Sequence, residues 1–171
     1  MIVFAGNAAI VLCPGGPRVR TFIGRKDNTN SAKPGGLPDV FDTAANLADL
    51  FAKKGYSQAE LAALMGAHST STQRFVDPSQ AGKSQDSTPG LWDVAYYKET
   101  IEHARTGRTP NNVFVFPSDA KLATYQDVGR NFQGFVNNQN KWSGAFGNAM
   151  EKMALFGNDK SKMVDCTSAL G

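Results

Sequence analysis

The chain has 171 residues, of which 41% are hydrophobic and 19% charged, so it fits one globular domain with a substantial core. The net charge is only +3 and no basic block is present, which argues against a dedicated nucleic-acid surface. No apolar run approaches the roughly 20 residues that cross a bilayer, and the start lacks the basic segment of a signal peptide, so we expect no membrane partner.

The first third of the chain predicts two helices joined by a connector. Residues 1–12 are apolar almost all round, which indicates the last part of a buried helix. Proline and glycine cannot continue a helix cheaply, so it ends at Cys13-Pro14-Gly15-Gly16-Pro17. Residues 18–38 form a connector rich in Gly, Pro and Asn. Helix patterning resumes at Asp39 and runs to Lys54, with Phe41 and Phe51 facing inward.

The next helix has a well-defined beginning. Ser57 and Glu60 have the spacing of a capping box, in which each side chain bonds the other residue's backbone N–H. One face of this helix carries Leu61, Leu64, Met65 and His68. A buried unpaired polar group costs about 1–3 kcal/mol, so His68 requires a backbone carbonyl, a carboxylate or a metal as partner.

The rest of the chain is predicted to be mostly helical. Residues 69–93 form a polar loop, a short helix covers 93–104, and the connector 105–117 contains the β-prone stretch 113–116. A long helix is expected over 118–138 and a last one over 141–156, before a tail that starts at Gly157. The fold class is therefore all-α, with at most a small β-hairpin.

Several motifs together resemble one family. Gly66-Ala67-His68-Ser69 is similar to the proximal-histidine motif of the plant, fungal and bacterial haem peroxidases. The match is extended by Cys13 to Pro17, by Gly24-Arg25-Lys26-Asp27, and by Asp86-Ser87-Thr88-Pro89-Gly90 with Asp93. Their order and spacing most resemble the secreted fungal class of lignin and manganese peroxidases. The resemblance implies the haem-peroxidase fold, with residues 1–171 as its proximal domain and 157–171 as an extended tail.

The resemblance also implies a haem site. His68 would coordinate the iron of haem b, and Asp119 would accept a hydrogen bond from the other ring nitrogen. From the residues alone, His68 is more often a core histidine bonded to a carbonyl, and Asp119 is a carboxylate favoured at a helix N-terminus. Arg74 would pair with a haem propionate, and a solvent-facing arginine is an equal alternative.

A calcium site is implied next to His68. The loop offers oxygen ligands suited to Ca²⁺ from Ser69, Asp86, Thr88, Leu91 and Asp93. On spacing alone, a turn in which Asp and Ser cap the neighbouring backbone explains these residues better. In the fungal class these positions match the proximal calcium site, and calcium there would anchor the backbone that holds the iron ligand.

The family's distal Arg-x-x-Phe-His segment does not occur in this sequence, whose only histidines are His68 and His103. We therefore assign no catalytic residue, and we expect a fragment that is truncated at its N-terminus. Ala63 and Arg74 occupy positions where lignin and manganese peroxidases carry a tryptophan and a carboxylate. Gln85 stands where some relatives place an aromatic residue near the haem. His103 is expected at the surface.

The cysteines fit the same expectation. In relatives, the position of Cys13 bridges to a cysteine in the half that this chain lacks, and the usual partner position of Cys166 is Arg130. A Cys13–Cys166 bond remains open from the sequence.

The expected function is that of a secreted haem peroxidase, a monomer at full length. It would reduce H₂O₂ while oxidising a phenolic or other small organic donor. The alternatives are a non-catalytic haem- or calcium-binding fragment, and a structural fragment without cofactor.

Overall fold

The computed structural model describes all residues, 1–171, and confirms the all-α prediction. Its helices are α1 (Ile2–Leu12), α2 (Ala44–Lys53), α3 (Gln58–Met65), α4 (Ala95–Thr106), α5 (Pro117–Leu122), α6 (Gln126–Phe135) and α7 (Gln139–Leu155). Short 3₁₀ turns cover Gly66–Thr70, Pro78–Gln80, Lys160–Lys162 and Thr167–Leu170. None of the helices combines the length and the apolar character that a membrane span requires.

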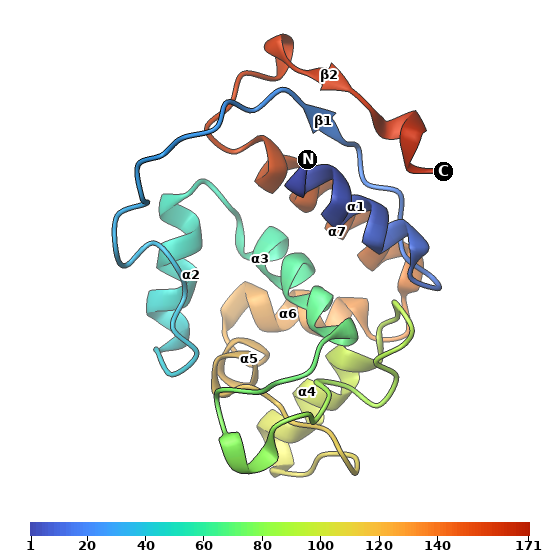
Figure 1. Cartoon of the computed structure of the whole chain (residues 1–171). Coiled ribbons are helices and arrows are strands. Elements are labelled where there is room, and N and C mark those ends of the chain that lie inside the picture. The colour runs from blue at the N-terminus through green and yellow to red at the C-terminus, as the bar shows by residue number, and fades with distance from the viewer.

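Helix α3 lies at the centre of the molecule, where it packs against α6 and α7 and also contacts α2 (Figure 1). Its beginning is the predicted capping box. Ser57 Oγ accepts the Glu60 N–H at 3.2 Å, and Glu60 Oε2 accepts the Ser57 N–H at 2.7 Å. Leu61, Ala62 and Ala63 are almost completely buried, so α3 is fixed in place before it reaches His68.

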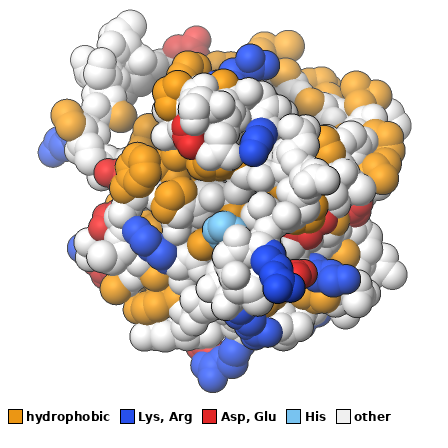
Figure 2. All heavy atoms as spheres, turned by 90° about the horizontal axis from the view of Figure 1, so that it is seen from below, with side chains coloured by type: hydrophobic (Ala, Val, Ile, Leu, Met, Phe, Trp, Pro, Cys, Tyr) orange, Lys and Arg blue, Asp and Glu red, His pale blue; other side chains and the backbone are white.

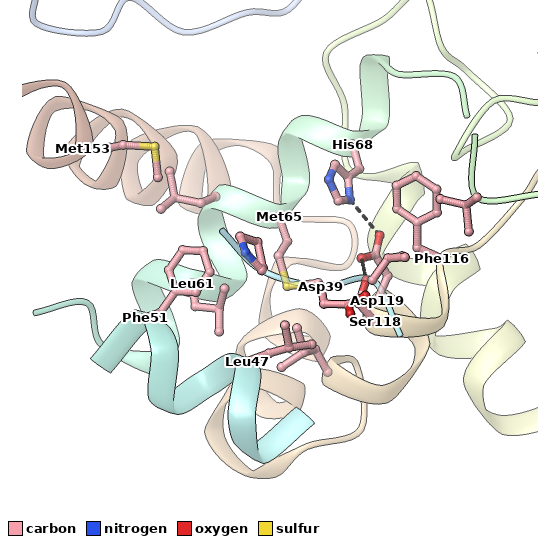
Figure 3. A pocket seen from close by; sticks show the side chains of 15 residues that line it. Asp39, Leu47, Phe51, Leu61, Met65, His68, Phe116, Ser118, Asp119 and Met153 are labelled. Atoms are coloured by element: carbon pink, nitrogen blue, oxygen red, sulfur yellow. Dashed lines mark hydrogen bonds and ion pairs between the residues drawn. The ribbon is translucent and has the colours of Figure 1, made fainter. Parts of the chain in front are cut away.

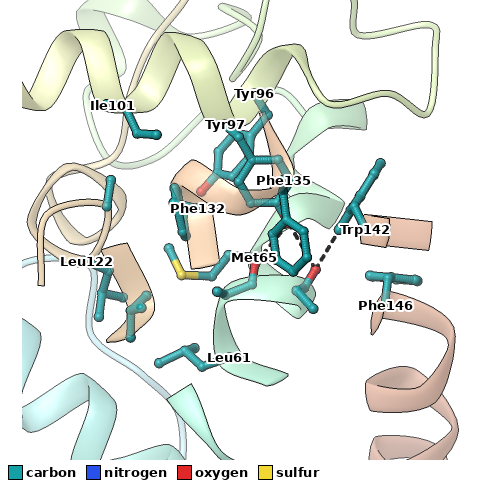
Figure 4. Packing of buried hydrophobic residues seen from close by; sticks show 14 of the residues in the cluster. Leu61, Met65, Tyr96, Tyr97, Ile101, Leu122, Phe132, Phe135, Trp142 and Phe146 are labelled. Carbon is teal, nitrogen blue, oxygen red and sulfur yellow. Dashed lines mark hydrogen bonds between the residues drawn. The ribbon is translucent and has the colours of Figure 1, made fainter. Parts of the chain in front are cut away.

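Aromatic side chains from α4, α6 and α7 enclose the end of α3 (Figure 4). Trp142 Nε1 donates to the Ala63 carbonyl at 3.0 Å, and the Tyr97 hydroxyl donates to the Ala62 carbonyl at 2.9 Å. These bonds satisfy carbonyls near the helix end, where intrahelical partners run out. The core therefore holds both the position and the direction of the segment that leads to His68.

The packing at the end of α3 leaves no room for a side chain at Gly66. A Cβ at this position would overlap Trp142 Nε1 and the Tyr97 hydroxyl, so both rings would have to shift. We expect Gly66→Ala to lower the free energy of unfolding by about 1–3 kcal/mol in urea denaturation. The control is Gly147→Ala in α7, because a Cβ there meets nothing within 4 Å and should stabilise by up to about 1 kcal/mol. Equal stability of the two variants would contradict the packing argument.

One predicted helix is wrong. The helix expected over 118–138 is two helices, because α5 ends at Leu122 and α6 begins at Gln126, whose φ is +39°. The connector predicted between the helices is confirmed: its β-prone stretch 113–116 forms no strand, and Val113 makes only an isolated bridge to Ser84. The sheet instead pairs β1 (Phe22–Ile23) antiparallel with β2 (Val164–Asp165), so the tail from Gly157 contains a strand and two 3₁₀ turns.

The first two helices also differ from expectation. Helix α1 is not buried: Ile2 is 90% exposed and Leu12 80% exposed, and Asn7 is its one buried residue. Helix α2 begins at Ala44 rather than Asp39, because the Thr43 hydroxyl caps it by accepting the Asn46 N–H. Phe41 therefore precedes the helix and is 62% exposed instead of facing inward.

Both cysteines are free. Cys13 and Cys166 are each half-buried, and the Cys13–Cys166 disulfide left open by the sequence is not formed.

Candidate functional site

His68 lies in the 3₁₀ turn Gly66–Thr70 that directly continues α3. Its side chain is 35% exposed, although its neighbours Met65 and Ser69 are buried. The Phe116 and Tyr96 rings stand edge-on to the imidazole, with centroids 5.6 and 5.9 Å away. Figure 2 shows a face of the molecule on which a histidine side chain lies in a depression among hydrophobic side chains.

The structure brings His68 and Asp119 together, as the family resemblance implied. His68 Nδ1 lies 2.7 Å from Asp119 Oδ2, although the two residues are 51 positions apart. Burial opposes the charged imidazolium, but the charge and hydrogen bond of Asp119 outweigh it, so the pKa of His68 is raised. An ionised carboxylate only accepts, so Nδ1 carries the proton, and in the neutral ring Nε2 keeps its lone pair.

Asp119 sits in the first turn of α5 and is 1% exposed. Pro117 starts this helix, which suits proline because the first helical N–H groups have no intrahelical partner. Besides His68, Asp119 accepts the Ser118 hydroxyl at 3.1 Å on Oδ1 and the Tyr96 hydroxyl at 2.8 Å on Oδ2. The carboxylate thus has three donors, which offset the cost of burying its charge.

Tyr96 is a site residue that the sequence reasoning missed. The sequence placed it only within a short helix, because nothing within a turn of Tyr96 points to Asp119. The one signal was a Tyr96-Tyr97 pair in an otherwise polar helix. Burial, and then the Asp119 charge, raise the pKa of Tyr96 well above its ordinary value, so its hydroxyl stays protonated.

An apolar hollow of about 340 Å³ opens beside His68. It is lined mostly by hydrophobic side chains, with His68, Asp119, Ser118 and Asp39 as its polar members. Figure 3 shows the second ring nitrogen of His68 directed away from Asp119, with Met65 and Phe116 on either side of the imidazole. The site therefore presents an unpaired imidazole nitrogen, backed by a carboxylate, beside an apolar cavity. An imidazole nitrogen in this setting suits the coordination of an iron ion that is held in a planar, apolar macrocycle.

A second group of polar atoms lies behind His68. Ser69 Oγ and Asp86 Oδ2 are both buried and have no hydrogen-bond partner. The Gln85 N–H donates to the Ser71 carbonyl at 3.1 Å, which holds the loop containing Asp86 alongside the segment after His68. Burial raises the pKa of Asp86 to about 7; the Thr88 N–H bond opposes the rise, and the Asp93 and Glu99 charges add to it. A bound cation would remove this penalty on the charged form.

The remaining predicted calcium ligands are close by. The Asp86 carboxylate accepts the Thr88 N–H at 3.0 Å, and the Thr88 hydroxyl donates to Asp93 Oδ2 at 2.9 Å. The Leu91 N–H donates to the Thr88 carbonyl at 2.8 Å. The loop contains no cluster of three or more acidic, His or Cys side chains, so hydroxyl and carbonyl oxygens would have to complete a cation site.

Other residues singled out in the sequence lie apart from these groups. Arg74 is exposed, forms no side-chain hydrogen bond or ion pair, and does not line the hollow, so its role stays a prediction. Gln85 is buried and accepts the Ser71 hydroxyl. The surface position expected for His103 is wrong, because the residue is half-buried on α4 with Nδ1 enclosed and unpaired.

Comparisons with known proteins show which family the chain is similar to. Residues 1–138 match the family described as peroxidase. Manganese peroxidase 3 of Phlebia radiata is 34% identical over 99% of this chain, which covers 50% of that protein. The low-redox potential peroxidase of Taiwanofungus camphoratus is 34% identical over 98% of the chain and 53% of its own length. Versatile peroxidase VPS1 of Pleurotus eryngii is 29% identical over 99% of this chain, which covers 49% of that protein.

These matches confirm the resemblance to the fungal peroxidases that the motifs around His68 indicated. The chain spans about half the length of the curated relatives it matches.

Proposed function

Because this chain belongs to the peroxidase family, whose members are haem-dependent oxidoreductases, we propose that it forms the proximal side of a haem b site. The enzyme would reduce H₂O₂ and oxidise a phenolic or other small organic donor. The observation that carries the proposal is the 2.7 Å contact between His68 Nδ1 and Asp119 Oδ2 beside an apolar hollow.

The residues of this chain have distinct roles in the proposal. His68 Nε2 would hold the iron, and Asp119 would fix the ring tautomer and make the imidazole a stronger donor. Met65 and Phe116 would exclude water from the coordinated nitrogen, and Arg74 would pair with a propionate. When bound, haem supplies the iron chemistry that cleaves peroxide and oxidises the donor. No residue of this chain is proposed as the base or cation that acts on peroxide.

We extend the proposal to Ca²⁺ in the loop behind His68. Ser69, Asp86, Thr88 and Asp93 would supply oxygen ligands together with the main-chain carbonyl of Leu91. The support is the pair of buried, unpartnered atoms Ser69 Oγ and Asp86 Oδ2. Since Ser69 follows His68 directly, bound calcium would also hold the backbone of the iron ligand.

Calcium removal tests this site. A ligand that binds only the folded state at 100 times its Kd stabilises it by about 2.7 kcal/mol. We therefore expect chelation to lower the free energy of unfolding by about this amount, measured by urea denaturation with and without Ca²⁺. Asp86→Asn should remove the calcium response. The control is Asp49→Asn, whose carboxylate pairs only with Lys53 on the surface. A full calcium response in Asp86→Asn would rule out the site.

The resemblance to the secreted fungal class extends the proposal to an extracellular protein, and we propose that it is monomeric at full length. A second candidate is a haem- or calcium-binding protein without catalysis. It would need only the His68–Asp119 pair beside the hollow and the buried oxygens of Ser69 and Asp86.

Two measurements separate the candidates. A Soret band that saturates on titration with haem, together with a histidine-ligated spectrum, is expected for both haem-binding functions. Peroxide-dependent oxidation of a phenolic dye is expected only for the peroxidase. Absence of any saturable Soret band would reject the haem site itself.

A further inference from the structure

Two donors converge on one oxygen of Asp119. His68 Nδ1 lies 2.7 Å from Oδ2, and the Tyr96 hydroxyl donates to the same Oδ2 at 2.8 Å. Ser118 uses the other oxygen, Oδ1, at 3.1 Å. His68 and Tyr96 therefore share Asp119 Oδ2, and the group that shares this oxygen with the imidazole is the neutral Tyr96 hydroxyl.

The position of the Tyr96 hydroxyl is set by ring packing. Tyr96 lies at the start of α4 and is 1% exposed. Its ring packs edge-on to His68 at 5.9 Å, and it contacts the rings of Tyr97 and Phe132 at 5.3 and 5.8 Å. Enclosed in this way, the ring cannot turn the hydroxyl toward solvent. Tyr96 is thus as firmly placed as the His68–Asp119 pair itself.

We infer that Tyr96 is a positioning residue that withdraws charge from Asp119 and so sets the strength with which His68 donates to the iron. This inference rests on the proposed haem site. A carboxylate that accepts a second hydrogen bond on the same oxygen holds the Nδ1 proton less strongly. The imidazole then has less imidazolate character, and the Fe(III)/Fe(II) potential is higher than His68 and Asp119 alone would set.

The test is Tyr96→Phe, which keeps the ring and removes only the donor. In haem-loaded protein we expect the Fe(III)/Fe(II) potential to fall and the iron–histidine stretching frequency in resonance Raman spectra to rise. In the haem-free chain, the NMR signal of the His68 Nδ1 proton should move downfield, because its hydrogen bond strengthens. A purely structural role for Tyr96 would not predict these coordinated shifts.

Tyr97→Phe is the matched control. Tyr97 is the next residue on α4 and equally buried, but its hydroxyl donates to the Ala62 carbonyl and does not touch Asp119. Because this bond supports α3 and not the carboxylate, Tyr97→Phe should change the potential and the proton signal much less than Tyr96→Phe does. A second variant replaces Tyr96 with 3,5-difluorotyrosine, whose more acidic hydroxyl donates more strongly. All three readouts should then shift in the opposite direction, with no buried hydrogen bond removed.

The inference is overturned if the potential or the Nδ1 proton signal stays unchanged in Tyr96→Phe. Equal shifts in Tyr96→Phe and Tyr97→Phe, or shifts of the same sign in Tyr96→Phe and the fluorinated variant, also overturn it. Failure of the proposed function is a different result, namely that the wild-type chain shows no histidine-ligated haem. In that case the haem-free proton signal still decides whether Tyr96 weakens the His68–Asp119 bond.

Discussion

His68→Ala is expected to abolish axial coordination of haem iron by this chain. Removing a residue that hydrogen-bonds a metal ligand typically lowers metal affinity about 10–100-fold. Removing the ligand His68 itself should lower the affinity for haem by more than the upper end of that range. The measurement is a haem titration followed by the Soret band, with the iron–histidine stretch read by resonance Raman. Wild type should show a saturating, histidine-ligated spectrum, and the variant should lose the stretch entirely.

The sequence provides a matched control for this substitution. His103 is the only other histidine, and it lies on α4 away from the hollow that His68 lines. His103→Ala should bind haem like wild type. Adding imidazole to His68→Ala should restore a nitrogen-ligated spectrum, because the substitution leaves space beside Asp119. An unchanged spectrum in His68→Ala, or loss of ligation in His103→Ala, would remove the central assignment.

Asp119→Asn is expected to raise the Fe(III)/Fe(II) potential and to weaken haem binding about 10–100-fold. Asparagine has the same shape, but its neutral amide oxygen accepts the Nδ1 proton of His68 less strongly than a carboxylate does. The imidazole then stabilises ferric iron less well. Redox titration of the haem-loaded variant measures the shift, and its sign is opposite to that expected for Tyr96→Phe.

Asp39→Asn separates local charge from the specific hydrogen bond. Asp39 lines the same hollow but is exposed, and its carboxylate accepts only the Phe41 N–H. Asp39→Asn therefore removes one negative charge from the hollow without changing any hydrogen bond of His68. We expect its potential and its haem affinity to remain close to those of wild type. A fall in potential for Asp119→Asn, or equal shifts in both variants, would contradict the proposed role of Asp119.

The pairing of His68 with Asp119 was predictable only through the family resemblance. From the residues alone, His68 required some partner and Asp119 suited the start of a helix, but nothing joined them across 51 positions. The structure adds what no motif indicated, namely that Tyr96 uses the same carboxylate oxygen. A tertiary contact of this kind depends on how α4 and α5 pack, not on any spacing along the chain.

Local features of the fold were determined by the sequence itself. Ser57 and Glu60 cap α3 because both partners lie within one helical turn, and no distant residue has to be in place first. In α7 the buried residues Trp142, Phe146 and Ala149 recur at helical spacing, whereas α3 buries Ala62 and Ala63 as fully as Leu61. Composition and helix patterning were therefore sufficient for the all-α class.

Only the tertiary structure decided the rest. Residues 118–138 divide into α5 and α6 because the chain turns after Leu122, which overrides a periodic pattern that would suit one long helix. The sheet joins Phe22–Ile23 to Val164–Asp165, a pairing of distant segments that the β-prone stretch at 113–116 did not predict. Contacts between distant segments depend on which surfaces meet when the helices pack, and short-range propensities carry no information about that.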